Sequence, residues 1–135
     1  MEKLVRFGVA VPENLLVEFD KWIKDRGIPN RSEAIRQLIR EFVAEGQWDK
    51  ETGTVYGAIT ITYDHHVHDT MGTLTSIQHD FGDVINCSTH VHIDHDHCLE
   101  IIVVSGNAGR IKELIDSLAS MKGLESVSPV ITTIL

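Results

Sequence analysis

The first 45 or so residues carry one strand pattern followed by two helix patterns, and this order restricts the folds that they can form. Residues 3–11, KLVRFGVAV, alternate apolar and other side chains with the period of a half-buried β-strand. Apolar residues then recur at helical spacing over 12–27 and 30–45. Because a lone strand cannot form a sheet and so short a unit buries little surface, we expect a dimer whose two strands pair.

Local signals mark the ends of both expected helices. Pro12 suits a first helical turn, and Gly27 suits a helix end. Asn30, with Glu33 three residues later, predicts a capping box at the start of the second helix. The N-terminal unit is therefore strand, helix, helix.

A second pattern, β-α-β-β-α-β, follows the polar segment AEGQWDKETG at 44–53. Strands are expected at 55–63, 84–93, 98–104 and 127–134, with helical spacing over 71–77 and 111–121. That order is typical of a ferredoxin-like fold. We place an N-terminal domain at 1–46, a linker at 47–53 and a C-terminal domain at 54–135.

Charge and histidine are distributed unevenly along the 135 residues. Residues 1–50 hold nine Lys/Arg and nine Asp/Glu, so the net charge of −8 comes entirely from the second half. All eight histidines lie within 65–97. The first half of the chain can therefore approach nucleic acid even though the whole chain is acidic. The second half contains the residue types of a metal site.

The first residues, MEKLVR, do not look like a secretory signal, and no apolar run reaches the length of a membrane span. Two cysteines, Cys87 and Cys98, are too few for a disulfide framework. We expect a cytoplasmic protein with reduced thiols and no membrane partner.

The stretch STHVHIDHDHCLE, at 88–100, points to a metal site. His90 and His92 are two apart on an expected strand, so both side chains leave the same face. Cys98 begins the adjacent strand, and His79 ends the preceding helix. Three imidazoles and one thiolate make a full four-ligand set for Zn, Cu, Fe or Ni, with tetrahedral and square-planar geometry both open. A filled set lacks the open position that a hydrolytic metal needs, which disfavours an enzyme.

A simpler interpretation makes these surface histidines and Cys98 an ordinary core thiol. Eight histidines in one 33-residue window, two of them beside a cysteine, favour the metal site instead. We assign the remaining candidates as follows. Cys87 is expected to be a buried thiol on the opposite face, and Glu100 to hydrogen-bond a ligand histidine. His95 and His97 are expected to be exposed, with contact to a metal ligand as the alternative. His65, His66 and His68 are expected to form a solvated loop, with a secondary metal site or ordering by nickel bound nearby as the alternatives.

The segment NRSEAIR, after a strand and a helix, resembles the ribbon-helix-helix DNA-binding domains. The pattern H-x10-H-x-H-x5-C, from His79 to Cys98, resembles the nickel-responsive regulators of the NikR type. The resemblance implies an α+β chain: an intertwined ribbon-helix-helix dimer followed by a ferredoxin-like βαββαβ domain of the ACT type. It further implies one square-planar Ni(II) per subunit in a homotetramer, held by His90, His92 and Cys98 of one subunit and His79 of its neighbour.

The same resemblance implies a DNA-binding regulator, not an enzyme, that represses nickel uptake genes when Ni(II) is bound. Arg6, Gly8 and Ala10 would enter the major groove of a palindromic operator. Asn30, Arg31 and Ser32, at the start of the second helix, would meet phosphates. The alternative is a metal store or chaperone whose first domain only dimerises; a metalloenzyme or an amino-acid-sensing domain ranks last.

Overall fold

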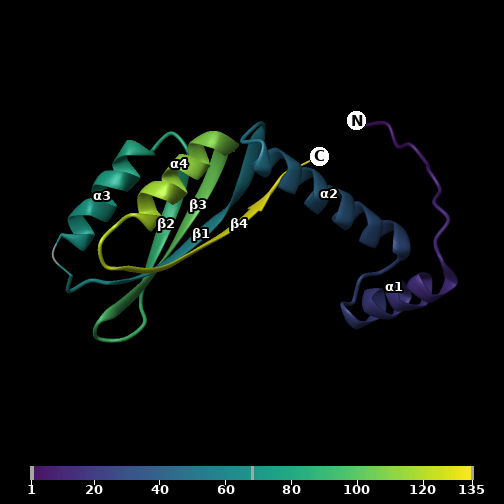
Figure 1. Ribbon diagram of the computed structural model, residues 1–135, viewed down its shortest axis with the longest axis horizontal. Coiled ribbons are helices and arrows are strands. Elements are labelled where there is room, and N and C mark those ends of the chain that lie inside the picture. The colour runs from purple at the N-terminus through teal and green to yellow at the C-terminus, as the bar shows by residue number, and fades with distance from the viewer. Residues whose placement is uncertain (1, 68, 135) are drawn as a thin grey trace. The chain divides into compact units, whose positions relative to one another are not determined.

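The computed structural model describes residues 2–67 and 69–134, and the chain divides into two compact units between Ile39 and Arg40. The described residues contain no helix that is both long and apolar enough to cross a membrane. The predicted α+β class is confirmed, with helices first and a four-stranded sheet after them (Figure 1).

The first unit contains helix α1 (Glu13–Asp25) and the start of helix α2 (Arg31–Asp49). Gly27, at φ +70°, ends α1 because its N–H bonds to the Lys24 carbonyl while the Ile28 N–H bonds to the Ile23 carbonyl. Those two bonds satisfy carbonyls that the last helical turn leaves free. At the start of α2, the Asn30 side chain accepts the Glu33 N–H at 2.8 Å, as the predicted cap requires.

Residues 2–11 are neither helix nor strand within the single chain. Val5, Phe7 and Val9 are 69–77% exposed there, so the alternating pattern buries nothing inside one copy. A strand needs a neighbour for its backbone hydrogen bonds, and the expected neighbour belongs to a second copy. Pairing between two copies therefore stays a prediction.

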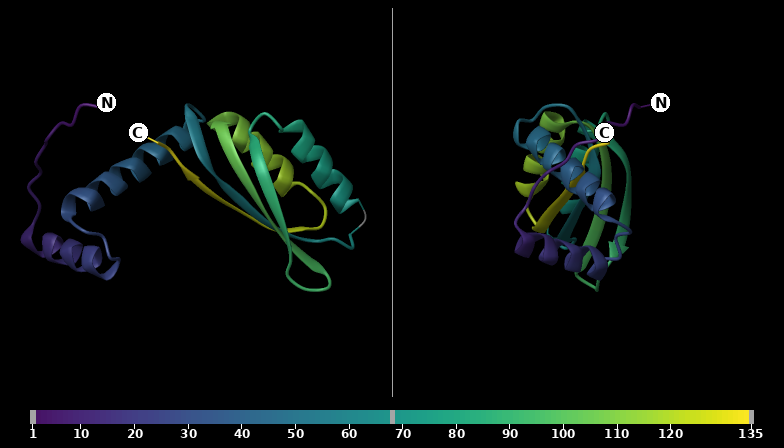
Figure 2. Two further views of the ribbon diagram at one scale, coloured as in Figure 1. Left: turned by 180° about the vertical axis from the view of Figure 1, so that it is seen from behind. Right: turned by 90° about the vertical axis from the view of Figure 1, so that its right-hand side faces the viewer.

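The second unit is built around an antiparallel sheet in the order β2-β3-β1-β4. Its strands are β1 (Thr54–Asp64), β2 (Ile85–His92), β3 (His97–Asn107) and β4 (Leu124–Thr132). Helices α3 (Thr70–Asp80) and α4 (Ala108–Ala119) lie together on one face (Figures 1 and 2). The element order and this layering confirm the predicted ferredoxin-like arrangement.

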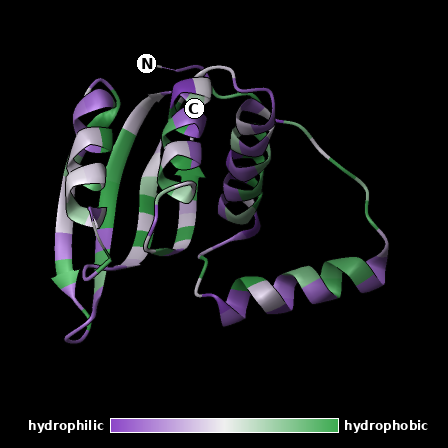
Figure 3. Cartoon of the chain, turned by 60° about the vertical axis from the view of Figure 1, so that its left-hand side comes forward, coloured by the Kyte–Doolittle hydropathy of each residue, from purple (hydrophilic) through white to green (hydrophobic). Residues whose placement is uncertain are grey.

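The core lies between the sheet and its two helices. Hydrophobic and hydrophilic residues alternate along the strands (Figure 3), as expected for a sheet with one covered face. The fully buried side chains come from both layers: Val55, Ile59, Ile61 and Tyr63 of β1, Ile102 and Val104 of β3, and Ile111, Leu114 and Leu118 of α4. Cys98 and Glu100 sit on this same covered face of β3, at 1% and 6% exposure.

The polar segment at 44–53 is more ordered than a flexible linker. Helix α2 continues through it to Asp49, and Trp48 packs against the core of the second unit. Beyond the helix, Glu51 and Gly53 adopt positive φ and lead directly into β1. Only residues 50–53 of the segment are therefore a non-helical connection.

Candidate metal centre

Strand register brings the side chains of the expected site to one end of the sheet. His92, the last residue of β2, pairs with Cys98 across the hairpin, and Cys98 pairs in turn with Tyr63 of β1. His90 pairs with Glu100 in the next row of the same face. Alternation along the strands puts the side chains of His90, His92, Cys98 and Glu100 on the face that α3 and α4 cover.

Cys98 is the centre of a three-donor group with His65 and His92. Its Sγ lies 3.3 Å from Nδ1 of His65 and 3.6 Å from Nδ1 of His92, and the three donor atoms lie within 4.8 Å of one another. Cys98 is buried, His65 is intermediate and His92 is exposed. The group thus lies at the boundary between the core and solvent, where an ion could contact two imidazoles and a sulfur at once.

His90 lies beside this group and is oriented by two neighbours. Its Nδ1 is 3.0 Å from the Tyr63 hydroxyl and 3.3 Å from Oε1 of Glu100. A carboxylate only accepts, whereas a tyrosine hydroxyl can do either, so both contacts are satisfied together when Nδ1 carries the proton. Nε2 of His90 is then the nitrogen with the free lone pair, and the ring centroid is 4.9 Å from that of His92.

Glu100 links this site to helix α3. Besides facing His90, its carboxylate accepts a hydrogen bond from the Gln78 side-chain amide. Gln78 directly precedes His79 on the helix. The predicted contact between Glu100 and a histidine of the candidate site, His90, is thus present in the structure.

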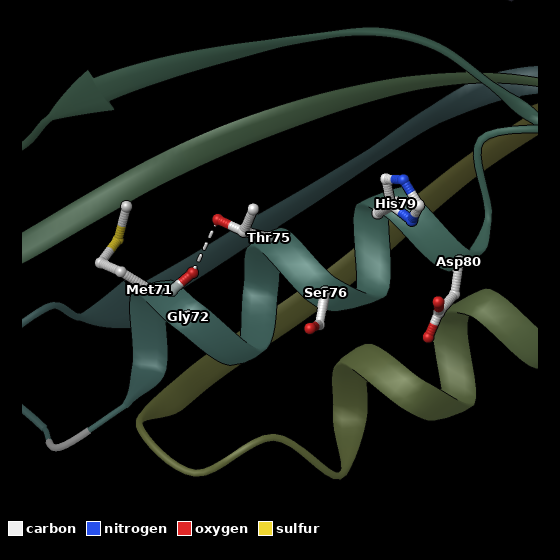
Figure 4. A pocket seen from close by; sticks show the side chains of 6 residues that line it. All are labelled: Met71, Gly72, Thr75, Ser76, His79 and Asp80. Carbon is white, nitrogen blue, oxygen red and sulfur yellow. Dashed lines mark hydrogen bonds between the residues drawn. The ribbon is translucent and has the colours of Figure 1, made fainter.

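His79 belongs to neither metal-capable group among the described residues. It is exposed at the C-terminal end of α3, next to Asp80 (Figure 4). The resemblance assigned it to the site of a neighbouring subunit, an arrangement that requires no contact between His79 and Cys98 of one chain. That assignment stays a prediction.

The loop histidines divide between two places. His65 joins Cys98, while His66 forms a second, fully exposed group with His95 and Asp96. His68 lies outside the described residues. His97 is intermediate in exposure rather than fully exposed, because its ring contacts Asp94 at 2.8 Å and Glu125 at 3.1 Å.

His65 is the site residue that sequence reasoning did not place next to Cys98. The signal lies in topology: a ferredoxin-like sheet pairs β1 with β3, and the observed register sets Tyr63 against Cys98. The chain that leaves β1 must therefore pass the Cys98 sulfur, which brings His65, two residues after Tyr63, beside it.

Cys87 also differs from expectation. It faces away from the site as predicted, but it is exposed rather than buried, because a single copy leaves that face of β2 open.

Burial and the neighbouring carboxylates favour the protonated form of the Cys98 thiol when no ion is bound. Burial, reinforced by the carboxylates of Glu100, Asp64 and Asp94, raises the pKa of the Cys98 thiol above its ordinary value. A metal ion held by this sulfur would reverse the preference, because it would bind the thiolate and offset the surrounding negative charge. Loading of the site through Cys98 would therefore release the thiol proton.

This proton release predicts a pH dependence of metal affinity. Between the titration range of imidazole and the raised pKa of Cys98, apparent Ni(II) affinity should rise about tenfold per pH unit, because one thiol proton leaves for each ion bound. Competition with a chelator of known affinity at pH 7.5, 8.0 and 8.5 measures the slope. A flat profile over that range would show that the sulfur does not bind the ion.

The expected DNA-contacting residues lie in the first unit. Arg6, Gly8 and Ala10 are exposed on the segment before α1. Arg31 forms a bidentate ion pair with Asp20 of α1, with Nε 2.8 Å from Oδ1 and Nη2 2.7 Å from Oδ2. This pair lowers the pKa of Asp20 and joins the two helices, so a phosphate at Arg31 would have to share its guanidinium with Asp20.

Two family models match this chain along most of its length. Residues 5–46 match the model described as "Ribbon-helix-helix protein, copG family", and residues 56–132 match the model described as "NikR C terminal nickel binding domain". The chain belongs to the NikR family. Members of this family are DNA-binding transcriptional regulators with a nickel-binding domain, not enzymes, as the sequence predicted.

Relatives across the whole length agree with this NikR assignment. A protein of Thermococcus onnurineus is 47% identical over 97% of this chain and 95% of its own length. A protein of Syntrophus aciditrophicus is 48% identical over 92% of this chain and 90% of its own length. Both bear the name "Putative nickel-responsive regulator". Among solved structures, an uncharacterized protein of Thermotoga maritima aligns with TM-score 0.53 at 15% identity, over 58% of this chain and 98% of its own, which shows a shared fold alone.

Proposed function

We propose that this NikR family member represses nickel uptake genes by binding their operators when Ni(II) is bound. The observation that carries the proposal is the convergence of Cys98, His92 and His90 at one end of the C-terminal sheet. The same chain carries a ribbon-helix-helix match in its N-terminal part. A metal-binding domain joined to a DNA-binding domain is the minimum that a metal-controlled repressor needs.

The residues present suit nickel. Imidazole nitrogens and a thiolate are donors that Ni(II) accepts, and the Cys98 sulfur already lies within 3.6 Å of a histidine nitrogen. In our proposal each subunit holds one ion through His90, His92 and Cys98, and His79 of a neighbouring subunit completes the set. The ion supplies the positive charge that stabilises the thiolate and holds these side chains together.

Glu100 and Tyr63 have a supporting role in this proposal. Both face Nδ1 of His90, so they would leave Nε2 of the ring available to the ion. Glu100 also contacts Gln78, next to His79 on α3. A subunit whose His79 serves a neighbour's site would therefore have its helix α3 linked, through Glu100, to its own site.

On the DNA side, we propose that two copies pair their 3–11 segments into a ribbon that enters the major groove. Arg6 would read a base edge, and Asn30, Arg31 and Ser32 would meet the phosphate backbone. Two such dimers in one tetramer would bind the two halves of a palindromic operator. A regulator of this kind would act in the cytoplasm, where the DNA is.

The test is DNA affinity measured with and without nickel. Fluorescence anisotropy with a duplex from the protein's own promoter region should show operator affinity about 5–150-fold higher after one equivalent of Ni(II) per subunit. Affinity should also fall steeply with salt, since phosphate contacts release counterions. Nickel binding with no change in DNA affinity would contradict the proposal and favour a metal store.

A further inference from the structure

Helix α3 is packed more firmly at its start than at its end. Its two buried side chains, Thr70 and Leu74, both lie in the first half of the helix. The second half carries Gln78 and His79 and, in the part of the chain that the structure describes, contributes no buried side chain. A helix end with few buried contacts opens easily. Polar contacts at the C-terminal end of α3 therefore decide how precisely His79 is placed.

Arg110 of α4 supplies such contacts. Its Nη2 donates to the Asp80 carbonyl at 2.8 Å, one of the carbonyls that a helix end leaves without an intrahelical partner. Its Nε lies 3.1 Å from Oδ2 of Asp83 and its Nη2 3.3 Å from Oδ1, which makes this ion pair bidentate. Its Cζ lies 4.0 Å from the centroid of the Phe81 ring. One side chain thus contacts three of the four residues at 80–83.

Arg110 is itself held in place by α4. It lies in the first turn of that helix, where the Asn107 side chain accepts its backbone N–H at 3.0 Å. The Glu113 carboxylate accepts a hydrogen bond from Nη1 at 3.0 Å, so each guanidinium nitrogen has an acceptor. Four side chains anchor α4 in the core: Ala108, Ile111, Leu114 and Leu118. The guanidinium therefore joins the end of α3 to the better packed helix.

We propose that Arg110 is a positioning residue for His79: it fixes the C-terminal end of α3 and so sets where a subunit presents this imidazole to its neighbour. The inference rests on the proposed function, in which His79 completes a neighbouring subunit's nickel site. His79 directly precedes Asp80, whose carbonyl Arg110 binds. A ligand on an ordered helix binds more tightly, because less freedom is lost when the ion arrives. Loss of the guanidinium therefore weakens nickel binding without removing a ligand.

Hydrogen exchange in the metal-free full chain tests the hold on the helix end. The Phe81 and Gly82 N–H groups close the last turn by donating to the carbonyls of Ile77 and His79, at 3.1 and 3.2 Å. Both amides should exchange about tenfold faster in Arg110→Ala, since a hydrogen bond to a charged group is lost. Unchanged exchange at both amides would overturn the inference.

Nickel affinity is the second measurement. By chelator competition, Arg110→Ala should bind Ni(II) about tenfold or more weakly than the unaltered protein. Glu113→Gln is the matched control, because it removes the carboxylate facing Nη1 on the same helix and leaves the contacts to 80–83 in place. It should keep both the affinity and the slow exchange.

Mixed tetramers separate positioning of His79 from a general effect on folding. In our proposal a subunit keeps its own Cys98 and gives its His79 to a neighbour, so loss of Arg110 affects only the donated ligand. Co-expressed with Cys98→Ser, Arg110→Ala should recover tight binding at about a quarter of all sites, because half of the interfaces are mixed and each has one intact site. Co-expressed with His79→Ala, it should recover none, because neither subunit then supplies a well-placed imidazole.

Asp83→Asn is a second variant that keeps Arg110 and its contact with Phe81, and it should show the same asymmetry with a smaller difference. Equal recovery in the two Arg110→Ala mixtures would overturn the inference, as would equal absence of recovery with both Arg110→Ala and Asp83→Asn. Full nickel binding by His79→Ala alone would overturn the proposed ligand set, and this inference with it. Poor binding by His79→Ala beside full binding by Arg110→Ala would overturn the inference alone.

Discussion

Replacement of Cys98 by serine should weaken Ni(II) binding by more than about 100-fold, since loss of an outer-sphere partner alone costs about 10–100-fold and this change removes a proposed ligand. The fold should survive. Serine is nearly the same size as cysteine, and its hydroxyl would lie close to His65 Nδ1, which is 3.3 Å from the present sulfur. Chelator competition measures the affinity, and the sulfur-to-nickel charge-transfer absorption should disappear.

Cys87→Ser is the control for this experiment. Cys87 is exposed and pairs with Val103 on the opposite face of the sheet, so its loss should leave both affinity and spectrum unchanged. A Cys98→Ser protein that keeps full nickel affinity and the charge-transfer band would show that the sulfur at the centre of the proposed site is not a ligand.

Mixing two inactive variants should restore part of the nickel binding if His79 serves a neighbouring subunit. His79→Ala and Cys98→Ser should each bind nickel poorly alone. In mixed tetramers, a His79→Ala subunit still offers Cys98, and a Cys98→Ser subunit still offers His79. With random pairing across a two-fold interface, half of the interfaces are mixed and each mixed one has a single intact site, so about a quarter of all sites should recover tight binding. Co-expression followed by nickel counting measures this fraction.

The alternative in this experiment is a site completed within one chain. His65 already lies beside Cys98, so it could take the fourth position that the proposal gives to His79. In that case His79→Ala alone would bind nickel fully, and His65→Ala would not. Recovery in the mixture, together with tight binding by His65→Ala, would leave His79 of the neighbour as the fourth ligand.

Local rules predicted most of the fold because each element carries its own signal. Asn30 caps α2 as its spacing to Glu33 indicated, and Gly27 lies just after the end of α1 as expected. In the second unit, alternating residues form strands and helical spacing forms helices close to the expected bounds. His92 and Cys98 meet because period-two alternation and a short turn fix which residues oppose each other in a hairpin.

Features that depend on more than one element were harder to predict. The position of His65 beside Cys98 follows from pairing of β1 with β3, which no local pattern reports. The exposure of Cys87 and the unpaired segment before α1 depend on surfaces that one copy leaves open. The extension of α2 to Asp49 reflects packing of Trp48, which outweighs the polar composition of that segment.

In our proposal, metal loading at Cys98 and DNA binding by the N-terminal segments are energetically coupled, and such coupling must be reciprocal. If Ni(II) raises operator affinity by a given factor, saturating operator must raise Ni(II) affinity by that same factor. We would titrate Ni(II) in the presence of operator duplex and of a scrambled duplex of equal length. We expect tighter nickel binding with the operator, by the factor found for DNA affinity. Identical nickel affinity with both duplexes would contradict it.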